Sequence, residues 1–583
     1  MKKTFLLSCL MLAAMPVMAA YTGHVYVDKN KNGVFDQSEK PLAGIKVSDG
    51  LNVVETAADG SFTLPGHERE RFIFITTPSG YKTFNRHYHK IEKKQSGYDF
   101  GLIPYSGRIR KNGSHRYIHI ADTEIFNTEN HADWVNNVRD YARNEQAAFI
   151  IHTGDICYEK GLKAHIKLMN TENMDCPVFY CIGNHDLVKG KYGEELFESI
   201  YGPVYYSFDA GNVHYVVTPM PGGDHAPGYT SDDVCRWLKN DLAHIRPGTP
   251  VVVFNHDLLT YEDTFIFKSK NAGSINLNEY NLKAWVYGHW HINYMKKQGD
   301  VYSVCTSSLD KGGIDHSTTA FRVMHVDSKG DFTSELRYTY LDKNICIASP
   351  AGVMASGVLP VAVNVYSSVS PVREVLYTCL ADGKPVLKNK RLLQSTDWSW
   401  NGELPLSHKY VGKELTLRVT ARFNNGEIAE AESNFICRTE KAVPLFSADW
   451  DNLSGNAKHS APVSAPLNLP LQLAWTNNVG ANLYMTSPLI HKGKVIVASV
   501  DEDLKGVGHV YVLNGKDGTI LWSCPVRNSI KNSIAVDSDI VFAQDAQGFL
   551  YAIDTETGKL CWEKQLPVNG LRALIDGLVA GEG

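Results

Sequence analysis

Short apolar runs alternate with longer amphipathic segments between residues 115 and 345. The runs read YIHIAD, AAFIIHTGD, CPVFYCIGNHD, VHYVVTP, PVVVFNHD and LKAWVYGHWH, and helix-like stretches such as HADWVNNVRDYARNEQ separate them. Uninterrupted apolar strands are typical of sheets covered on both faces, and their alternation with helices favours a layered α/β arrangement. We therefore predict an α/β core over residues 111–345.

The segments on either side of this core show the two-residue period of half-buried strands. YTGHVYVD and TAADGSFTLPG precede it, and LPVAVNVYSS and KELTLRVTARFNNG follow it, with turn residues between them. Such patterning predicts all-β modules. The expected order along the chain is a signal peptide at 1–20, a β-sandwich-like module at 21–110, the core at 111–345, a second β module at 346–440, a linker at 441–469 and a repeat region at 470–583.

The repeat region has a period of 40 residues. VYVLNGKDGTILWSCPV at 510–526 aligns with LYAIDTETGKLCWEKQL at 550–566, which places Trp522 on Trp562. This period is typical of propeller blades, and the repeats resemble those of quinoprotein (PQQ-type) propellers. A third repeat begins at 572–583. Because so few repeats cannot close a propeller, we predict an incomplete, partial β-propeller at the C-terminal end.

The N-terminal residues predict export. MKKTFLLSCLMLAAMPVMAA has two lysines, an apolar stretch and a small-residue cleavage signal at Val17-Met18-Ala19, which is typical of a secretory signal peptide. A lipoprotein signal at Cys9 is disfavoured because too few apolar residues precede it. We expect a periplasmic or cell-surface protein with no transmembrane segment. The net charge of −5 and the lack of a long basic stripe argue against a nucleic-acid partner.

A twelve-residue segment within the first β module matches a calcium-binding loop. Alternating oxygen ligands with a glycine at the sixth position are what a calcium ion requires, and Gly33 occupies that position in DKNKNGVFDQSE. A polar turn without metal is the alternative reading. The candidate calcium ligands are Asp28, Asn30, Asn32, Asp36 and Glu39.

Metal-binding side chains follow four of the apolar runs of the core. Functional groups gather at the carboxyl ends of strands in α/β sheets, so these residues can converge on one cleft. Carboxylate, amide and imidazole groups together suit divalent first-row metals, and one carboxylate can bridge two ions. The residues are Asp155, Asn184, His185, Asp186, His256, His289 and His291.

In sequence order, GD at 154–155, GNHD at 183–186, a run ending in His256 and GHWH at 288–291 resemble the calcineurin-like metallophosphoesterase family, and the flanking β modules resemble those of its exported bacterial members. The resemblance implies a β-sandwich core flanked by helices and two metals bridged by Asp155. It implies that one metal is held by Asp122 and His291, and the other by Asn184, His256 and His289. His185 is implied as the acid near the leaving group, with Asp186 orienting it. A metal-bridging hydroxide would attack phosphorus.

The sequence departs from the family in its first motif, where Glu124 stands in place of the usual histidine of Asp-x-His. An oxygen ligand there would favour manganese, iron or magnesium over zinc, and all of manganese, iron and zinc stay open as the two divalent ions. Tyr158 also follows Asp155 as in the GDxxY motif of purple acid phosphatases, which makes it another candidate ligand. Two interpretations of Glu124 stay open: it binds the metal directly or supports a ligand from behind, or its presence weakens the first metal and slows turnover.

We therefore predict an exported, metal-dependent phosphoesterase acting on a small-molecule, glycan or lipid phosphate mono- or diester. The sequence leaves two alternatives open. One is a binding or scaffold protein with a weakened metal site. The other is a fragment of a quinone-dependent dehydrogenase, which the repeat region alone suggests.

Overall fold

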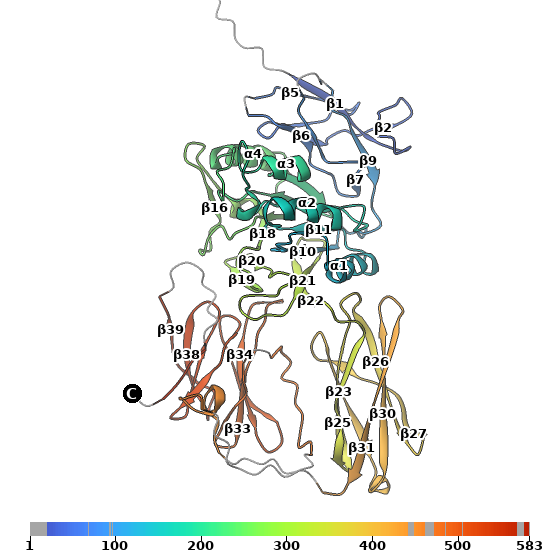
Figure 1. The fold of residues 1–583 in the computed structure, drawn as a ribbon, viewed down its shortest axis with the longest axis vertical. Coiled ribbons are helices and arrows are strands. Elements are labelled where there is room, and N and C mark those ends of the chain that lie inside the picture. Colours follow the sequence, from blue (N-terminus) through green and yellow to red (C-terminus); the bar gives the residue numbers. More distant parts are fainter. Residues whose placement is uncertain are drawn as a thin grey trace, which may run out of the picture.

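A computed structural model of the chain describes residues 20–67, 69–92, 95, 97–440, 448–460, 472–483, 486–503, 505–567 and 577–581. The predicted signal peptide, with Cys9, lies outside the described residues except for Ala20. Most of the predicted linker and most of the third repeat also lie outside them. Figure 1 shows the first β module above the central layers, with two further β-rich modules side by side below.

The first module consists of short strands in two small sheets. One sheet has the order β2-β1-β9-β7 with β5 pairing on β1, and the other has the order β4-β3-β6-β8. Val25, Val47 and Leu102 are fully buried between them. The strands are β1 (Tyr21–Val27), β2 (Lys40–Pro41), β3 (Lys46–Ser48), β4 (Val53–Glu55), β5 (Ser61–Leu64), β6 (Phe72–Ile75), β7 (Tyr81–Thr83), β8 (Tyr88–Lys90) and β9 (Phe100–Pro104).

The central module is built on two sheets that pack face to face. A five-stranded sheet has the order β12-β11-β10-β21-β22, and a six-stranded sheet has the order β13-β14-β15-β18-β20-β19. The strands are β10 (His115–Ile120), β11 (Phe149–His152), β12 (Val178–Tyr180), β13 (Tyr206–Ala210), β14 (Val213–Val217), β15 (Val251–Phe254), β18 (Leu282–Tyr287), β19 (Tyr294–Gln298), β20 (Val301–Cys305), β21 (Ala320–Val326) and β22 (Phe332–Tyr338); β16 (Ile266–Lys268) and β17 (Ser274–Asn276) form a separate hairpin.

Aromatic side chains fill the space between the two sheets. The ring of Tyr117 from β10 lies 5.6 Å, centroid to centroid, from that of Tyr215 from β14, and edge-to-face contacts of this kind are favourable. Helices cover the outer faces, as Figure 1 shows for α1 and α4. The helices are α1 (Ala132–Asn144), α2 (Tyr158–Leu168), α3 (Glu195–Tyr201) and α4 (Ser231–Ala243), with short 3-10 turns η1 (Asn184–Asp186) and η2 (Leu277–Tyr280). This helix–sheet–sheet–helix order agrees with the predicted layered core.

A buried ion cluster ties α4 to the six-stranded sheet. Both ring nitrogens of His214, on β14, face carboxylates: Nδ1 lies 2.7 Å from Asp209 Oδ1 and Nε2 lies 2.8 Å from Asp241 Oδ2. Burial disfavours the charged ring, but the charge of Asp241 and the hydrogen bonds to Asp209 and Asp241 outweigh it and raise the pKa of His214 to about 9.

This cluster predicts a loss of stability at alkaline pH. The pKa of His214 is about 9 when folded, against an ordinary value of 6.5. The protonated ring therefore adds on the order of 3 kcal/mol to the free energy of unfolding. This contribution is fully present below about pH 6.5 and is lost as pH rises through about 9. The free energy of unfolding, measured by urea denaturation at about pH 6 and about pH 9.5, should fall more between these two pH values for the unmodified chain than for His214→Gln. Equal drops in both proteins would contradict this assignment, and His408→Gln, at an exposed histidine, is the control.

The second β module and the repeat region complete the chain. The second module is a sandwich of β23 (Asn344–Ser349), β25 (Gly357–Tyr366), β29 (Ser399–Leu406) and β28 (Leu393–Gln394) against β24 (Gly352–Ala355), β31 (Ile428–Arg438), β30 (Glu414–Phe423), β26 (Val372–Ala381) and β27 (Lys384–Arg391), with the 3-10 turn η3 (His408–Tyr410). After the 3-10 turn η4 (Leu453–Gly455), the repeat region forms two four-stranded sheets. The first sheet has the order β32 (Leu489–His491), β33 (Lys494–Ala498), β34 (His509–Asn514) and β35 (Ile520–Pro525). The second has the order β36 (Ala535–Asp537), β37 (Ile540–Gln544), β38 (Phe549–Asp554) and β39 (Leu560–Gln565).

In both repeats a tryptophan ring packs directly against a glycine. Gly518 has a positive φ of 73°, and a Cβ there would lie 2.3 Å from the ring of Trp475. Gly558, one repeat later, has a φ of 70°, and a Cβ there would lie 2.6 Å from Trp522. Each glycine therefore leaves room for the indole ring of a tryptophan from the preceding segment. This packing explains why glycine and tryptophan recur in the repeats.

The repeat region packs against the central module through buried polar contacts. Lys531 Nζ lies 2.6 Å from Asp315 Oδ2 and also contacts Glu502 and the carbonyl oxygen of Asn293. The Lys531 side chain is only 1% exposed. Arg322 on β21 donates to the carbonyl oxygen of Glu502 at 2.7 Å. The repeats therefore share a buried interface with the central module.

Candidate metal centre

The predicted metal ligands follow strands whose carboxyl ends meet. Strands β10, β11 and β12 run parallel to one another, as do β15 and β18. The parallel direction places the residues after these strands at the same edge of the two sheets. Asp122 follows β10, Asp155 follows β11, Asn184 begins η1 after β12, His256 follows β15, and His289 and His291 follow β18.

The carboxylate of Asp155 is common to the groups of side chains that could hold a metal here. Ligand atoms within 4.8 Å of one another occur in three sets: Asp155 with His256 and His289, Asp155 with Asp122 and His291, and Asp155 with Glu124 and Cys157. A single carboxylate shared between neighbouring sets can bridge two cations. The structure thus brings the predicted histidines and aspartates together around one residue.

His256 is held so that one ring nitrogen faces the carboxylates. Its Nδ1 lies 2.7 Å from the carbonyl oxygen of Thr153, to which it donates. Its Nε2 lies 3.1 Å from both Asp155 Oδ2 and Asn184 Oδ1. A backbone acceptor on the far nitrogen fixes the tautomer and orientation of a histidine ligand. Asn184 and His256 therefore converge on Asp155, as the resemblance implied.

Carboxylates are crowded in this buried site. Burial, together with the charges of Asp155 and Glu124, raises the pKa of Asp122 well above its usual range, although His256 opposes the shift. Burial lowers the pKa of His256, but the charges of Asp155 and Asp122 raise it overall to about 10. Buried carboxylates of this kind require compensating positive charge. Divalent cations fit this donor set of carboxylate, amide and imidazole groups.

Two glycines of the motifs allow the backbone to approach the ligands closely. A Cβ on Gly183 would lie 2.2 Å from Asp155 Oδ1, and one on Gly288 would lie 2.6 Å from Asp122 Oδ2. The backbone N–H of His289 donates to Asp122 Oδ2 at 3.0 Å. Glycine is therefore required by packing at both motif positions.

The backbone around the site is strained. Left-handed conformations are uncommon for residues other than glycine and cluster at functional sites. Positive φ angles occur at Asp122 (51°), Glu124 (44°), Asp155 (53°), Cys157 (73°), Tyr158 (49°), His289 (64°) and His291 (51°). The strain therefore coincides with the candidate ligands, which indicates a functional constraint on these turns.

Glu124 faces the same cluster as His291. Its Oε1 lies 3.5 Å from His291 Nε2, and its Oε2 lies 2.8 Å from Lys311 Nζ. His291 Nε2 also lies 3.5 Å from Asp122 Oδ1. Lys311 neutralises part of the charge of Glu124, a partner that the sequence pattern did not reveal. The position of Glu124 is thus compatible with two roles: binding a metal directly, or holding the candidate ligand His291 in place.

The predicted role of Asp186 differs from the observed geometry. Asp186 accepts hydrogen bonds from the backbone N–H groups of Gly183 and Cys157, both at 2.9 Å. The ring of His185 instead lies with Nδ1 2.9 Å from Asp224 Oδ2. In the described part of the chain the orienting carboxylate is therefore Asp224. Asp186 instead holds two turns together, because its buried carboxylate accepts from Gly183 in its own turn and from Cys157, 29 residues earlier in the chain.

The environment of His185 favours its charged form. Partial burial lowers its pKa, but the hydrogen bond to Asp224 and the charges of Asp155, Asp224 and Glu124 raise it overall. The backbone N–H of His185 also donates to Asp155 Oδ1 at 3.0 Å. A cationic imidazole at the edge of the site is suited to donate a proton.

Tyr158 lies at the rim of the site. Its side chain is 44% exposed, and its ring stacks on Phe126 with centroids 6.4 Å apart. Burial raises the pKa of Tyr158, and the neighbouring Cys157 and carboxylates raise it further. The thiol of Cys157, which the sequence did not single out, forms a set of neighbouring ligand atoms with Glu124 and Asp155.

The predicted calcium loop folds around its own hydrogen bonds. The backbone N–H groups of Asn32 and Gly33 donate to the two carboxylate oxygens of Asp28, and Lys29 N–H donates to Glu39. Asn30 donates to Asp36 at 2.9 Å. Among the described residues, these carboxylates do not form a set of three ligand atoms within 4.8 Å. Calcium binding by this loop stays a prediction.

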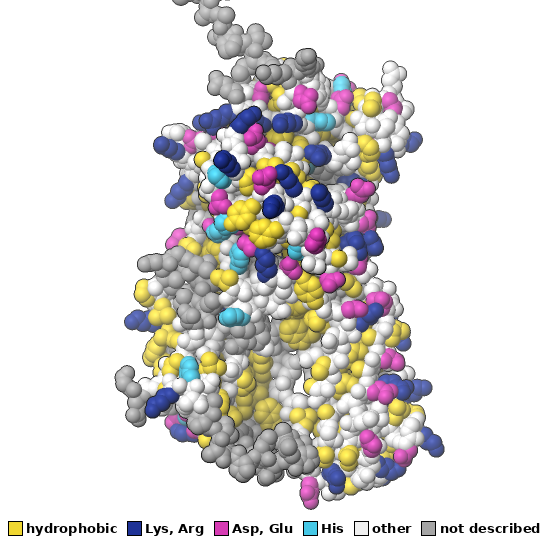
Figure 2. All heavy atoms as spheres, viewed as in Figure 1, with side chains coloured by type: hydrophobic (Ala, Val, Ile, Leu, Met, Phe, Trp, Pro, Cys, Tyr) yellow, Lys and Arg dark blue, Asp and Glu magenta, His cyan; other side chains and the backbone are white. Residues whose placement is uncertain are grey.

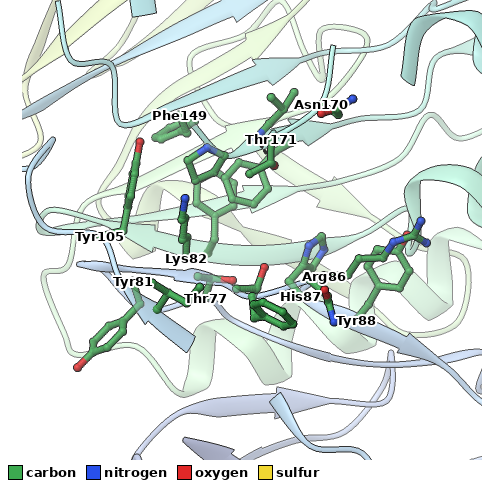
Figure 3. Close-up of a pocket in the computed structure, with 18 of the residues that line it drawn as sticks. Thr77, Tyr81, Lys82, Arg86, His87, Tyr88, Tyr105, Phe149, Asn170 and Thr171 are labelled. Atoms are coloured by element: carbon green, nitrogen blue, oxygen red, sulfur yellow. Dashed lines mark hydrogen bonds between the residues drawn. The ribbon is translucent and has the colours of Figure 1, made fainter. Parts of the chain in front are cut away.

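A separate pocket of about 650 Å³ lies between the first β module and the central module. Figure 3 shows Tyr105, Lys82 and Phe149 on one side of it and Arg86, His87 and Tyr88 on the other. None of the predicted metal ligands lines this pocket. It is therefore distinct from the carboxylate and histidine cluster, and pocket size does not locate the chemistry in this protein.

Three family models match successive parts of the chain. Residues 29–104 match the N-terminal domain of calcineurin-like phosphoesterases, residues 115–293 match the calcineurin-like phosphoesterase domain, and residues 472–578 match the outer membrane protein assembly factor BamB. The central module is therefore a calcineurin-like phosphoesterase domain, and the tail is a BamB-like, PQQ-type repeat region. The predicted resemblance and fold class are confirmed.

A curated relative is similar over the catalytic part. Purple acid phosphatase 13 of Arabidopsis thaliana is 26% identical over 215 residues, which are 34% of this chain and 36% of that protein. The chain thus spans about a third of the length of this relative. Together with the phosphoesterase domain, this similarity supports a metal-dependent hydrolase of phosphoric esters.

Two solved structures are similar to parts of the chain, each with a low alignment score. A conserved uncharacterized protein of Streptococcus pneumoniae, described as a predicted phosphoesterase, is 12% identical with a TM-score of 0.19, over 39% of this chain and 98% of that one. BamB of Moraxella catarrhalis is 15% identical with a TM-score of 0.15, over 16% and 28%. Alignments at these scores do not bear on the fold.

The surface and the helices add two further observations. Figure 2 shows basic and acidic side chains interspersed on the face that it presents. Within the described residues, every helix is too short or too polar to cross a bilayer.

Proposed function

We propose that this protein is an exported two-metal phosphoesterase that hydrolyses a small phosphate mono- or diester. The observation that carries the proposal is the position of Asp155, whose carboxylate belongs to the histidine set of His256 and to that of His291. Two metals would be held by Asp122 and His291 on one side of Asp155, and by Asn184, His256 and His289 on the other. Export rests on the N-terminal sequence.

Divalent cations bound there would draw charge from the phosphoryl oxygens and make a water molecule more acidic. The protein would then supply the proton for the leaving group. His185 lies at the edge of the cluster, and Asp224 holds its Nδ1, so that Nε2 is free to donate a proton to the departing oxygen. Asp186 would keep the turn that carries His185 in place through its backbone hydrogen bonds.

The purified full-length chain is expected to hydrolyse 4-nitrophenyl phosphate or bis(4-nitrophenyl) phosphate. Activity should disappear after dialysis against a chelator and return with manganese, iron or zinc, because the carboxylates need cations to position the ester. Release of 4-nitrophenol measures both esters. If neither ester is hydrolysed with any of these metals, the protein is not a phosphoesterase, and a scaffold with a weakened site becomes the better interpretation.

The metal at the Glu124 side is tested by metal analysis of Glu124→His and Glu124→Ala. If Glu124 binds directly, the alanine variant should retain less metal than the unmodified chain, and the histidine variant should shift the preference toward zinc, since imidazole suits zinc better than a hard carboxylate does. The same metal content in all three proteins would place Glu124 outside the ligand set. The proposal covers an ester carried by a glycan, by a lipid headgroup or by a small molecule.

A further inference from the structure

Two aromatic rings stand exposed at the rim of the metal centre. Phe126 is 58% exposed and Tyr158 is 44% exposed, and they are among the most exposed large apolar side chains of the central module. Their rings are stacked, with centroids 6.4 Å apart and planes at 19°. Leaving such rings in water forgoes the free energy of burying them, so a pair of them side by side calls for an explanation.

The pair lies beside the proposed acid. The ring centroid of Tyr158 is 5.4 Å from that of His185. The backbone N–H of His185 in turn donates to Asp155, the carboxylate shared by the metal sets. The rings thus lie on the side of the cluster that carries His185, where the proposed mechanism has the leaving group depart.

The chain is held in an unfavourable conformation where it presents Tyr158. Cys157 and Tyr158 have φ angles of 73° and 49°. Ile125, immediately before Phe126, is almost completely buried at 2% exposure and anchors the neighbouring turn. The strain and the anchor fix both rings in place on the surface, so the platform is preorganised.

We propose that Phe126 and Tyr158 form a stacking platform for the leaving group, and that the substrate is a phosphoester whose leaving group carries a flat aromatic ring. This inference rests on the proposed phosphoesterase function and names the substrate class for it. Both an aryl group and a nucleobase have the flat π-face that stacks on such rings. The experiment distinguishes these two sources.

Three phosphates with primary alkoxide leaving groups separate stacking from leaving-group chemistry: benzyl phosphate, adenosine 5′-monophosphate and cyclohexylmethyl phosphate. Phe126→Ala and Tyr158→Ala should each lower kcat/KM for an aromatic substrate by about 5- to 100-fold, chiefly through KM, since stacking on one ring is worth that much. The effect on cyclohexylmethyl phosphate should stay below about twofold. A larger loss with adenosine monophosphate than with benzyl phosphate would assign a nucleobase, and the reverse would assign an aryl group.

Two further variants control the interpretation. Tyr158→Phe keeps the ring and should leave KM unchanged. If the Tyr158 hydroxyl were a metal ligand, the same variant would bind less metal. Trp562→Ala removes an aromatic side chain that is 45% exposed in the repeat region and should have no effect. Equal losses for all three phosphates in the alanine variants, or loss of metal in Tyr158→Phe, would overturn the platform.

Binding tests the platform without relying on turnover. Calorimetry with the manganese-loaded full-length chain should show tighter binding of benzylphosphonate than of cyclohexylmethylphosphonate, and Phe126→Ala should abolish the difference. Equal affinities in the unmodified chain would refute the platform. This outcome is distinct from failure of the proposed function, which would appear as absence of metal-dependent hydrolysis of 4-nitrophenyl phosphate.

Discussion

Replacing Asp155 by asparagine is expected to reduce kcat/KM by about 10³-fold or more, because Lewis acidity from the metals contributes several kcal/mol to such reactions and each 1.4 kcal/mol is worth tenfold. Asp155 is the carboxylate shared by the metal sets. An asparagine retains an oxygen that can accept the His185 N–H, so the turn should fold as before. The measurement combines steady-state kinetics with metal content by mass spectrometry.

The matched control is Asp382→Asn, the same change at a carboxylate that is 75% exposed and pairs with Lys413. That variant should keep the activity and the metal content of the unmodified chain. If Asp155→Asn retains both full metal content and full activity, the bridging position is wrong and another carboxylate must join the metals.

Replacing Lys531 by methionine is expected to destabilise the chain by about 3–5 kcal/mol, because it leaves two buried carboxylates without their cation. The side chains of Asp315 and Glu502 are 0% and 4% exposed, and Lys531 contacts both. The earliest transition in urea denaturation should move to lower concentration. Because Asn293 also contacts Lys531 and lies two residues after His291, metal affinity should weaken as well.

The triple variant Lys531→Met, Asp315→Asn, Glu502→Gln tests the cause. Removing the carboxylate charges together with the lysine should restore much of the stability, since replacing a whole buried ion cluster costs far less than breaking it. Lys492→Met, at a lysine that is 56% exposed and pairs with Asp539, should change stability by less than about 1 kcal/mol. A triple variant as unstable as the single one would show that packing, not charge, holds the interface.

Those parts of the site that lie on strand ends could be predicted from the sequence. An apolar run followed by Asp122, Asp155 or His256 indicates both the strand and the ligand, because parallel strands deliver their carboxyl ends to one edge. The order of the motifs along the chain carries the family resemblance, which in turn implies the roles of the residues. The structure brings the candidate ligands Asp155, His256 and His289 together, and likewise Asp155, Asp122 and His291.

Residues that act from distant loops could not be predicted in the same way. Asp224 comes from a glycine-rich loop, and its contact with His185 depends on how that loop folds over η1. Lys311 reaches Glu124 from a turn, and Lys531 reaches Asp315 from another module, with no local pattern to mark either lysine. The resemblance implies Asp186 as the orienting carboxylate because it adjoins His185 in the GNHD motif, whereas the fold places Asp224 on the His185 ring.

The strained turns around the metal centre have a consequence for how the protein behaves when metal is scarce. Each left-handed residue costs on the order of 1–3 kcal/mol, and such conformations persist only where surrounding contacts enforce them. Ligands that bind the native state selectively stabilise it by mass action. Metal supply would therefore also set how often these loops open, so that cofactor availability would govern the lifetime of the folded enzyme as well as its rate.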